Sequence, residues 1–267
     1  SEGLKSWVPV LGIEKFLTSE SGVLGFSTYR VLLYTFLIFL FSTIGFFGWY
    51  ESAKNKFYRN FILLATGSGA YHILLILFNL RRTFWNDPIL KIVLLNIALA
   101  FLLFQTFKSV RITPKRLGVV LLILIVSLLP FYHEILTLRT GALRSWMPDF
   151  GIANALTDQN GYVRGLGSYR VLVYFLCVHL FSHIGWICWF FDSRGKRYRA
   201  FVLVPAVLSL YQVIVILMSW QETEFNSPDL KLYVTLGISI LLALNFYFNN
   251  KVSQHNPIIE NTLNEKD

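Results

Sequence analysis

The sequence is poor in charged residues, which occupy only 15% of its 267 positions. Soluble domains carry roughly 25% charged residues, so this chain lacks the polar surface that would keep it in water. Hydrophobic residues make up 55% of the sequence. They gather in runs of about twenty residues, the length that an α-helix needs to cross the hydrocarbon core of a bilayer. The composition excludes a soluble globular domain and predicts an all-α integral membrane protein.

Cysteine is also scarce, since Cys177 and Cys188 are the only two in the chain and both lie in one apolar run. On a single helix they would lie about 16 Å apart along the axis, too far for a disulfide. Phosphate-cradling glycine loops, nucleophile elbows and cysteine clusters are missing as well. Residues 1–27 have no apolar core of the kind that a cleavable signal peptide carries.

No Asp or Glu lies well inside a predicted span, which argues against a carboxylate proton relay or a strongly sodium-coupled carrier. The net charge of +9 comes from basic residues in short loops between the apolar runs. That placement is typical of topology signals and lipid-headgroup contacts. We therefore expect the lipid bilayer as a partner and no nucleic acid.

The strongest pattern is an internal repeat. Residues 29–91 return as residues 169–231, always 140 positions later and without a gap. The matches include Tyr-Arg-Val-Leu at 29–32 and 169–172, Leu-Phe-Ser at 40–42 and 180–182, Tyr-Arg at 58–59 and 198–199, and the pairs Pro88/Pro228 and Lys91/Lys231. A gapless register of this length predicts two copies of one structural unit.

We predict seven transmembrane helices, at roughly 29–49, 58–79, 89–107, 117–136, 169–190, 199–219 and 229–249. The chain then divides into an outer interfacial segment (1–28), a three-helix repeat (29–107), a linker loop and helix (108–138), a second outer interfacial segment (139–168), a second three-helix repeat (169–249) and a disordered cytoplasmic tail (250–267).

The loops 50–59, 108–116 and 191–199 are rich in lysine and arginine. The positive-inside rule places them in the cytoplasm, with the N-terminus outside and the C-terminus inside, in a membrane such as the bacterial inner membrane. Loop 80–88 falls on the other side and is an exception, because it contains Arg81 and Arg82.

Three helices followed by one linker helix restore the direction of the chain, so the two repeats are expected to run parallel around an axis along the membrane normal. This 3+1+3 plan resembles that of the SWEET sugar transporters and the PnuC vitamin transporters. The resemblance concerns architecture alone, because neither first helix contains a Pro-Gln motif of the SWEET type. The openings Tyr29-Arg30 and Tyr169-Arg170 also resemble the first helix of DoxX-like and HTTM-type membrane domains, a likeness that implies no chemistry.

Four basic residues stand near predicted helix N-termini on the outer side: Arg30, Arg170, Lys91 and Lys231. Helix N-termini already carry positive partial charge, and outer loops disfavour basic residues. One interpretation is a basic vestibule that attracts an anion, a carboxylate or a lipid phosphate. The alternative is that these side chains only extend to lipid headgroups.

Polar residues recur at equivalent positions inside the spans, among them Tyr34, Tyr174, Tyr71 and Tyr211. In lipid such groups should face the interior of the bundle, because only there can they find partners. They fit either contacts to a solute or hydrogen bonds between helices.

His179 and His183 lie one helical turn apart, a spacing that can supply two metal ligands, and His72 is a candidate third. The sequence requires no cofactor, but a metal or a haem is compatible with these three. The alternative is that they are hydrogen-bonded packing residues.

These patterns leave three functional hypotheses open. The leading one is a membrane protein that binds and translocates a small anionic or amphipathic solute along the pseudo-twofold axis. The second is a membrane-embedded enzyme with a histidine-bound metal or haem acting on a lipid or quinone. The third is a structural or assembly subunit, either in a homo-oligomer or with a membrane-complex partner.

Overall fold

The computed structural model describes residues 18–19, 22–23, 26, 28–107, 113–138, 140–146, 157, 163, 166–196, 198–220 and 223–255. Its main helices are α2 (Tyr29–Ser52), α3 (Lys56–Leu77), α4 (Pro88–Phe107), α5 (Pro114–Leu128), α6 (Tyr132–Leu136), α8 (Tyr169–Asp192), α9 (Arg199–Leu217) and α10 (Pro228–His255). Short elements are β1 (Thr18–Ser19), β2 (Gly22–Val23), η1 (Leu80–Arg82), η2 (Phe84–Asn86), η3 (Leu129–Phe131) and η4 (Glu224–Asn226). Much of the two expected interfacial segments, and residues 256–267 of the expected tail, lie outside the described residues.

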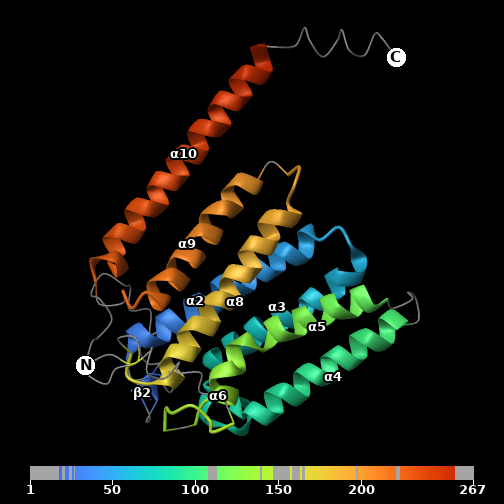
Figure 1. The fold of residues 1–267 in the computed structure, drawn as a ribbon, viewed down its shortest axis with the longest axis vertical. Helices are drawn as coiled ribbons and strands as arrows, with labels where there is room; N and C mark the ends of the chain where they lie inside the picture. The colour runs from blue at the N-terminus through green and yellow to red at the C-terminus, as the bar shows by residue number, and fades with distance from the viewer. Residues whose placement is uncertain are drawn as a thin grey trace.

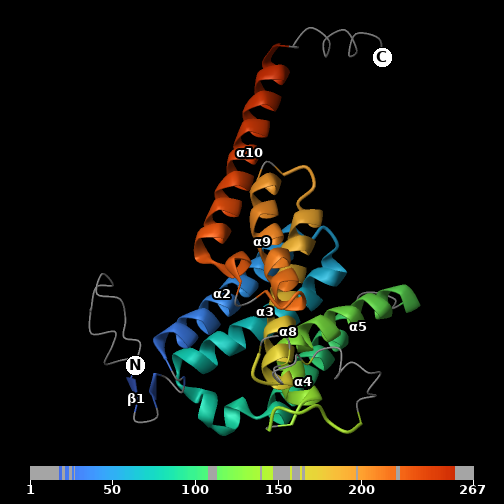
Figure 2. The ribbon, with the colours of Figure 1, turned by 60° about the vertical axis from the view of Figure 1, so that its left-hand side comes forward.

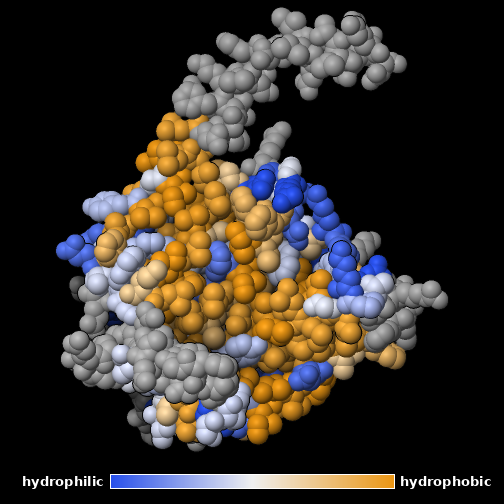
Figure 3. Space-filling model, in the orientation of Figure 1, coloured by the Kyte–Doolittle hydropathy of each residue, from blue (hydrophilic) through white to orange (hydrophobic). Residues whose placement is uncertain are grey.

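Six helices are long and apolar enough to cross a membrane: 29–52, 57–77, 88–106, 114–136, 169–192 and 199–217. In an apolar stretch of 18 residues within each of these helices, only 17% to 50% is buried within the protein. At least half of each stretch therefore faces outward. Figure 3 shows the resulting broad hydrophobic surface, with hydrophilic residues gathered toward its edges. An apolar exterior of this extent needs lipid around it. The protein is therefore a polytopic, helical membrane protein, as the composition predicts.

The helices fall where the sequence predicts spans, with two differences. The fourth span is not one straight helix, because η3 separates α5 from α6 at Pro130. Proline lacks the amide proton that the helix would use and clashes with the preceding turn. The seventh predicted span, 229–249, falls within α10, which continues as a helix to His255 and is not among the six helices named above. α10 projects beyond the other helices at its C-terminal end (Figures 1 and 2).

Local sequence signals explain where the helices begin. Thr28 and Ser168 precede α2 and α8, and their side-chain hydroxyls accept hydrogen bonds from the amides of Val31 and Val171 at 3.3 and 3.4 Å. These are N-caps, which satisfy amides that have no partner within the helix. Both α4 and α10 begin at a proline, the residue preferred at the first helical position.

α2 and α8 cross at the centre of the fold and run in the same direction. A Cβ added at Gly45 would lie 3.2 Å from the backbone nitrogen of Trp186, and one at Gly185 would lie 3.1 Å from that of Phe46. Toward the far end of both helices, the Trp49 indole donates to the Asp192 carboxylate at 2.7 Å. The missing side chains at the two glycines allow this close approach of backbones.

The remaining helices pack around this central pair. α3 lies against α2 and also against α5, while α9 lies against α8 and α10 lies against α9. A buried core joins α2, α3, α4, α5 and α8 through large side chains such as Phe46, Phe61, Ile62 and Phe181. The ends at which α2, α4, α8 and α10 begin collect the buried polar residues described next.

Candidate functional site

Lys91 lies in the first turn of α4 and is 3% exposed. The start of α4 is fixed by Asp87, whose carboxylate accepts a hydrogen bond from the amide of Ile89 at 2.8 Å. Pro88 follows as the first helical residue. The order of a capping residue and then proline therefore places Lys91 in the first turn of the helix rather than in the loop.

The Lys91 ammonium makes a two-pronged ion pair with Glu134 of α6. Its Nζ lies 3.0 Å from both carboxylate oxygens, and both side chains are buried. Removing two charges from water is costly, and the pair offsets this cost only while both partners are present. The pair therefore ties the linker segment to the start of α4.

Other ionisable groups gather around this ion pair. The His72 ring stacks on Phe39 at 4.2 Å and on Phe131 at 4.8 Å between ring centroids, and its Nδ1 lies 2.9 Å from the Ser68 carbonyl oxygen. Arg81 places its guanidinium 3.8 Å over the Phe26 ring. Burial lowers the pKa of this guanidinium, which still stays charged because an unperturbed arginine titrates above 12.

A small cavity of about 40 Å³ lies within this cluster and is lined by the pair, by Arg81, and by His72, His133 and Tyr174. Such a volume holds a few water molecules at most. Lys91 is thus paired with Glu134 of α6, and little room remains in this cavity for a solute.

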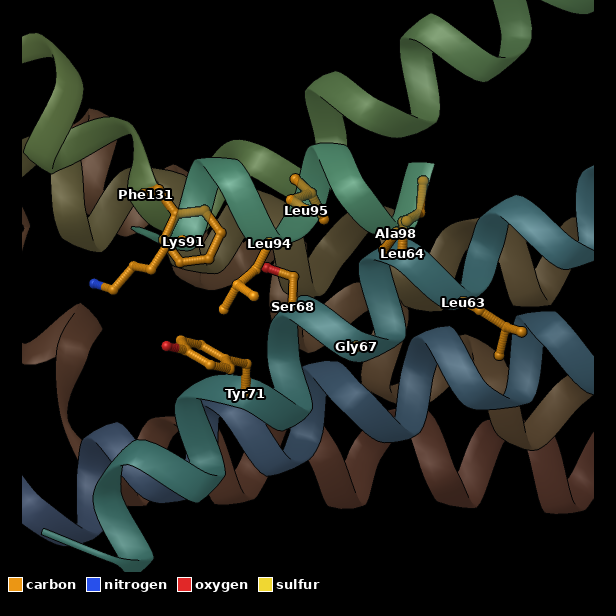
Figure 4. Close-up of a pocket in the computed structure, with 10 residues that line it drawn as sticks. All are labelled: Leu63, Leu64, Gly67, Ser68, Tyr71, Lys91, Leu94, Leu95, Ala98 and Phe131. Atoms are coloured by element: carbon orange, nitrogen blue, oxygen red, sulfur yellow. The ribbon is translucent and has the colours of Figure 1, made fainter. Parts of the chain in front are cut away.

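A larger apolar cavity of about 220 Å³ adjoins the cluster between α3 and α4. Figure 4 shows Lys91, Tyr71 and Phe131 at one end of this cavity and Leu63 at the other. Within the cavity lining, only Ser68, Tyr71 and Lys91 bring polar atoms. The Tyr71 hydroxyl donates to the Trp85 carbonyl oxygen, so it is already in use.

Another cavity, with a volume of about 370 Å³, lies around Lys231 at the start of α10. Lys231 donates to the Asn226 side-chain oxygen at 2.6 Å, and it makes no ion pair with any described residue. An ammonium group has three protons to donate. Further polar groups in the lining come from α8 and α9: His179, Ser182, Ser209, Tyr211 and Gln212.

The two cavities use equivalent positions of the repeats. Tyr71 and Lys91 line the first, while Tyr211 and Lys231, 140 positions later, line the second. The Tyr211 hydroxyl donates to the Phe225 carbonyl oxygen, as Tyr71 does to that of Trp85. The two cavities differ in how their lysines are paired. Glu134 forms an ion pair with Lys91, whereas no described carboxylate pairs with Lys231.

The other predicted binding residues are spread over the same end of the bundle. Arg30 is exposed at the start of α2. Arg170 donates a hydrogen bond at 3.4 Å to the carbonyl oxygen of Leu138, 32 positions away in the sequence. The Tyr34 hydroxyl lies 2.5 Å from His179 Nε2, which joins α2 to α8. Tyr174 belongs to the cluster around Lys91 instead. The structure does not bring all eight residues into one vestibule.

The three histidines proposed as metal ligands make separate contacts. His72 stacks near Lys91, His179 contacts Tyr34, and His183 Nδ1 lies 3.1 Å from both the Ala206 carbonyl oxygen and the Ser209 hydroxyl. Within the described ranges, no three His, Cys, Asp or Glu side chains form a group that could hold a metal ion. Each ring is instead placed by hydrogen bonds or stacking.

Glu134 and Arg144 are missing from the binding residues predicted from the sequence, and Arg81 is noted there only as an exception in its loop. Glu134 follows Pro130 in an apolar run, and an acidic residue there is a signal that a buried partner exists. Arg81 carries a similar signal, since it opposes the positive-inside rule. Arg144 has no such signal in the sequence.

Comparison of the chain with protein-family models, with curated proteins and with solved structures gives no match.

Proposed function

We propose that this membrane protein has seven spans arranged as two parallel three-helix repeats joined by the linker helix. Support comes from equivalent geometry 140 positions apart. Asn79 and Ser219 both end their helices in the left-handed region, with φ of 54° and 58°. The reciprocal approach of Gly45 and Gly185 is what a pseudo-twofold axis between α2 and α8 would produce. With the basic loops in the cytoplasm, this arrangement puts the N-terminus outside and the C-terminus inside.

We further propose that the protein binds and translocates a small anionic or amphipathic solute, and that the cavity around Lys231 is the binding site. The observation that carries this proposal is the contrast between the two lysines. Lys91 is buried against Glu134, whereas Lys231 faces a cavity of about 370 Å³ without a carboxylate among the described residues. A buried or half-buried cation in a membrane protein needs a counter-charge, which a bound anion supplies.

An adjoining hollow supports an amphipathic solute. It has a volume of about 440 Å³ and is lined by α2 alone, through Tyr34, Leu37, Ile38, Leu40, Phe41 and Ile44. Ile38 and Phe41 line both this hollow and the cavity around Lys231. An anionic head at the lysine would thus leave an apolar tail beside α2, where lipid is also accessible.

Translocation along the axis between the repeats requires a change of conformation. The rings of Phe46 and Phe181 pack 4.5 Å apart there, and both side chains are fully buried. In the proposed cycle, α2 and α8 separate to let the solute pass, and the present arrangement is closed at this level.

A fluorescent medium-chain fatty acid is a suitable probe, because it joins a carboxylate to an apolar tail. We expect Lys231→Gln to weaken binding to the purified protein by about tenfold or more, since a hydrogen bond to a charged group contributes about 1.5–3 kcal/mol. Release of the preloaded probe from proteoliposomes should slow in parallel.

Lys115→Gln is the matched control, because Lys115 is an exposed lysine at the other end of the bundle. It should bind and release the probe as the wild type does. Unchanged affinity and flux in the Lys231→Gln protein would refute the assignment of the site. A further outcome combines two results: Lys231→Gln binds the probe with unchanged affinity, and cross-linking α2 to α8 abolishes flux. Transport between α2 and α8 would then be supported, but Lys231 would have no role in it.

A further inference from the structure

A separate cavity of about 730 Å³ lies where α4 begins and where α6 connects to α8. Two arginines line it, Arg144 from the segment after α6 and Arg170 from the first turn of α8. None of the three cavities that Lys91 or Lys231 lines includes these side chains. The function proposed above does not use this cavity.

Backbone carbonyl groups hold both arginines in place but use few of their protons. Arg170 Nη1 donates to the Leu138 carbonyl oxygen at 3.4 Å, and Arg144 Nη2 donates to the Glu134 carbonyl oxygen at 3.5 Å. Arg144 Nε is buried and has no hydrogen-bond partner among the described residues. A guanidinium carries five N–H donors in a planar fork that matches the oxygens of a phosphate. Among the described residues, the two guanidinium groups donate only to these two carbonyl groups, which leaves several donors for a ligand.

The two carboxylates in the cavity lining are committed elsewhere. Both oxygens of Glu134 bind the Lys91 ammonium at 3.0 Å. Asp87 caps α4 by accepting from the amide of Ile89 at 2.8 Å. Lys91 balances Glu134, and Asp87 keeps one negative charge, so the two arginines still leave a net positive charge among the described groups around the cavity.

Apolar side chains form the edge of the same cavity. Ile89 is 72% exposed, Trp146 is 60% exposed and Leu138 is 41% exposed. Tryptophan is enriched at the boundary between headgroups and hydrocarbon, where its ring is buried and its N–H stays hydrated. α4 continues from this edge as a membrane span, with Val93 and Ile97 exposed along it.

We propose that this cavity binds the headgroup phosphate of an anionic phospholipid. Arg144 and Arg170 hold the phosphate oxygens through charge-assisted hydrogen bonds. The indole of Trp146 lies at the level of the lipid glycerol, and an acyl chain runs down the exposed face of α4 from Ile89.

Native mass spectrometry of the full chain, purified with equal amounts of phosphatidylglycerol and phosphatidylcholine of the same acyl chains, tests this proposal. We expect the wild type to retain phosphatidylglycerol in preference. The variant Arg144→Gln/Arg170→Gln should lose at least about tenfold in apparent affinity for phosphatidylglycerol, with phosphatidylcholine binding unchanged. The variant Lys115→Gln/Arg194→Gln removes two exposed positive charges at the other end of the bundle and should behave as the wild type does.

Three results would overturn the proposal. The first is wild-type retention of phosphatidylglycerol by Arg144→Gln/Arg170→Gln, and the second is an equal loss in the control variant. The third is that inorganic phosphate alone protects the wild type, but not the arginine variant, against heat while displacing no lipid. The site would then bind a free anion rather than a phospholipid.

The wild type itself provides a readout that does not depend on how a variant folds. Phosphatidylglycerol with a photoreactive diazirine in its acyl chain should label peptides from the beginning of α4. Labelling confined to helices that do not border the cavity would contradict the assignment.

Discussion

The Lys91 ammonium and the Glu134 carboxylate show how far a single pair of side chains can determine local structure. They lie 43 positions apart in the sequence and 3.0 Å apart in space. The capping sequence before α4 predicts that Lys91 lies at a helix start. It does not predict its partner, because that contact depends on where the break at Pro130 directs α6. The sequence pattern does not specify the direction that α6 takes after Pro130.

Glu134→Gln should destabilise the protein by about 3–5 kcal/mol, because the change leaves a buried ammonium without a counter-charge. The double variant Lys91→Met/Glu134→Gln should be more stable than Glu134→Gln alone, since the unpaired charge is then gone. Thermal unfolding in detergent measures both. Lys231→Met is the control and should cost less. Equal stability of Glu134→Gln and the wild type would show that the pair contributes nothing.

At the level of helices, α2 and α8 approach closely because the glycines at their contact have no side chain. A Cβ at Gly48 would lie 2.3 Å from the Trp189 ring, whereas a Cβ at Gly67 in α3 would meet no atom within 4 Å. The sequence marks both as small residues in an apolar run and cannot distinguish them. Only the neighbouring helix decides which glycine is required.

Gly48→Ala should therefore lower stability by about 1–3 kcal/mol, the usual cost of forcing an extra methyl group into a packed interface. Gly67→Ala provides a matched comparison, because the same substitution in open space should raise helix stability by about 0.5–1 kcal/mol. Melting temperatures of the two variants in one detergent test this difference. If the two shifts have the same sign, the close approach of α2 and α8 is not what the structure describes.

At the scale of the whole molecule, hydrophobic runs predict the membrane class and the approximate bounds of the six described spans, because burial in lipid imposes both length and apolarity. These runs do not predict which charged side chains form ion pairs and which line cavities. Arg30, Arg170, Lys91 and Lys231 look alike in the sequence, yet one is exposed, one is buried in an ion pair, and two line different cavities. The burial of Lys91 depends on Glu134, which α6 supplies from outside the helix that carries the lysine.

The parallel arrangement proposed above predicts which loops share a side of the membrane. Single cysteines at Lys54 and Arg194, in a background with Cys177 and Cys188 replaced by alanine, should react with an impermeant maleimide from the same side. A cysteine at Phe84 should react from the opposite side. Labelling of intact and inverted vesicles distinguishes these cases. Reaction at Lys54 and Arg194 from opposite sides would exclude parallel repeats.

The engagement of Lys91 by Glu134 has a consequence for the amount of ligand that one chain can take up. The two repeats proposed above would ordinarily bind two equivalents of ligand, yet Glu134 of α6 engages Lys91, whereas Lys231 faces open space. Saturation with the carboxylate probe should therefore occur at one equivalent per polypeptide, along a simple hyperbola. Neutralising Glu134 should move that endpoint toward two.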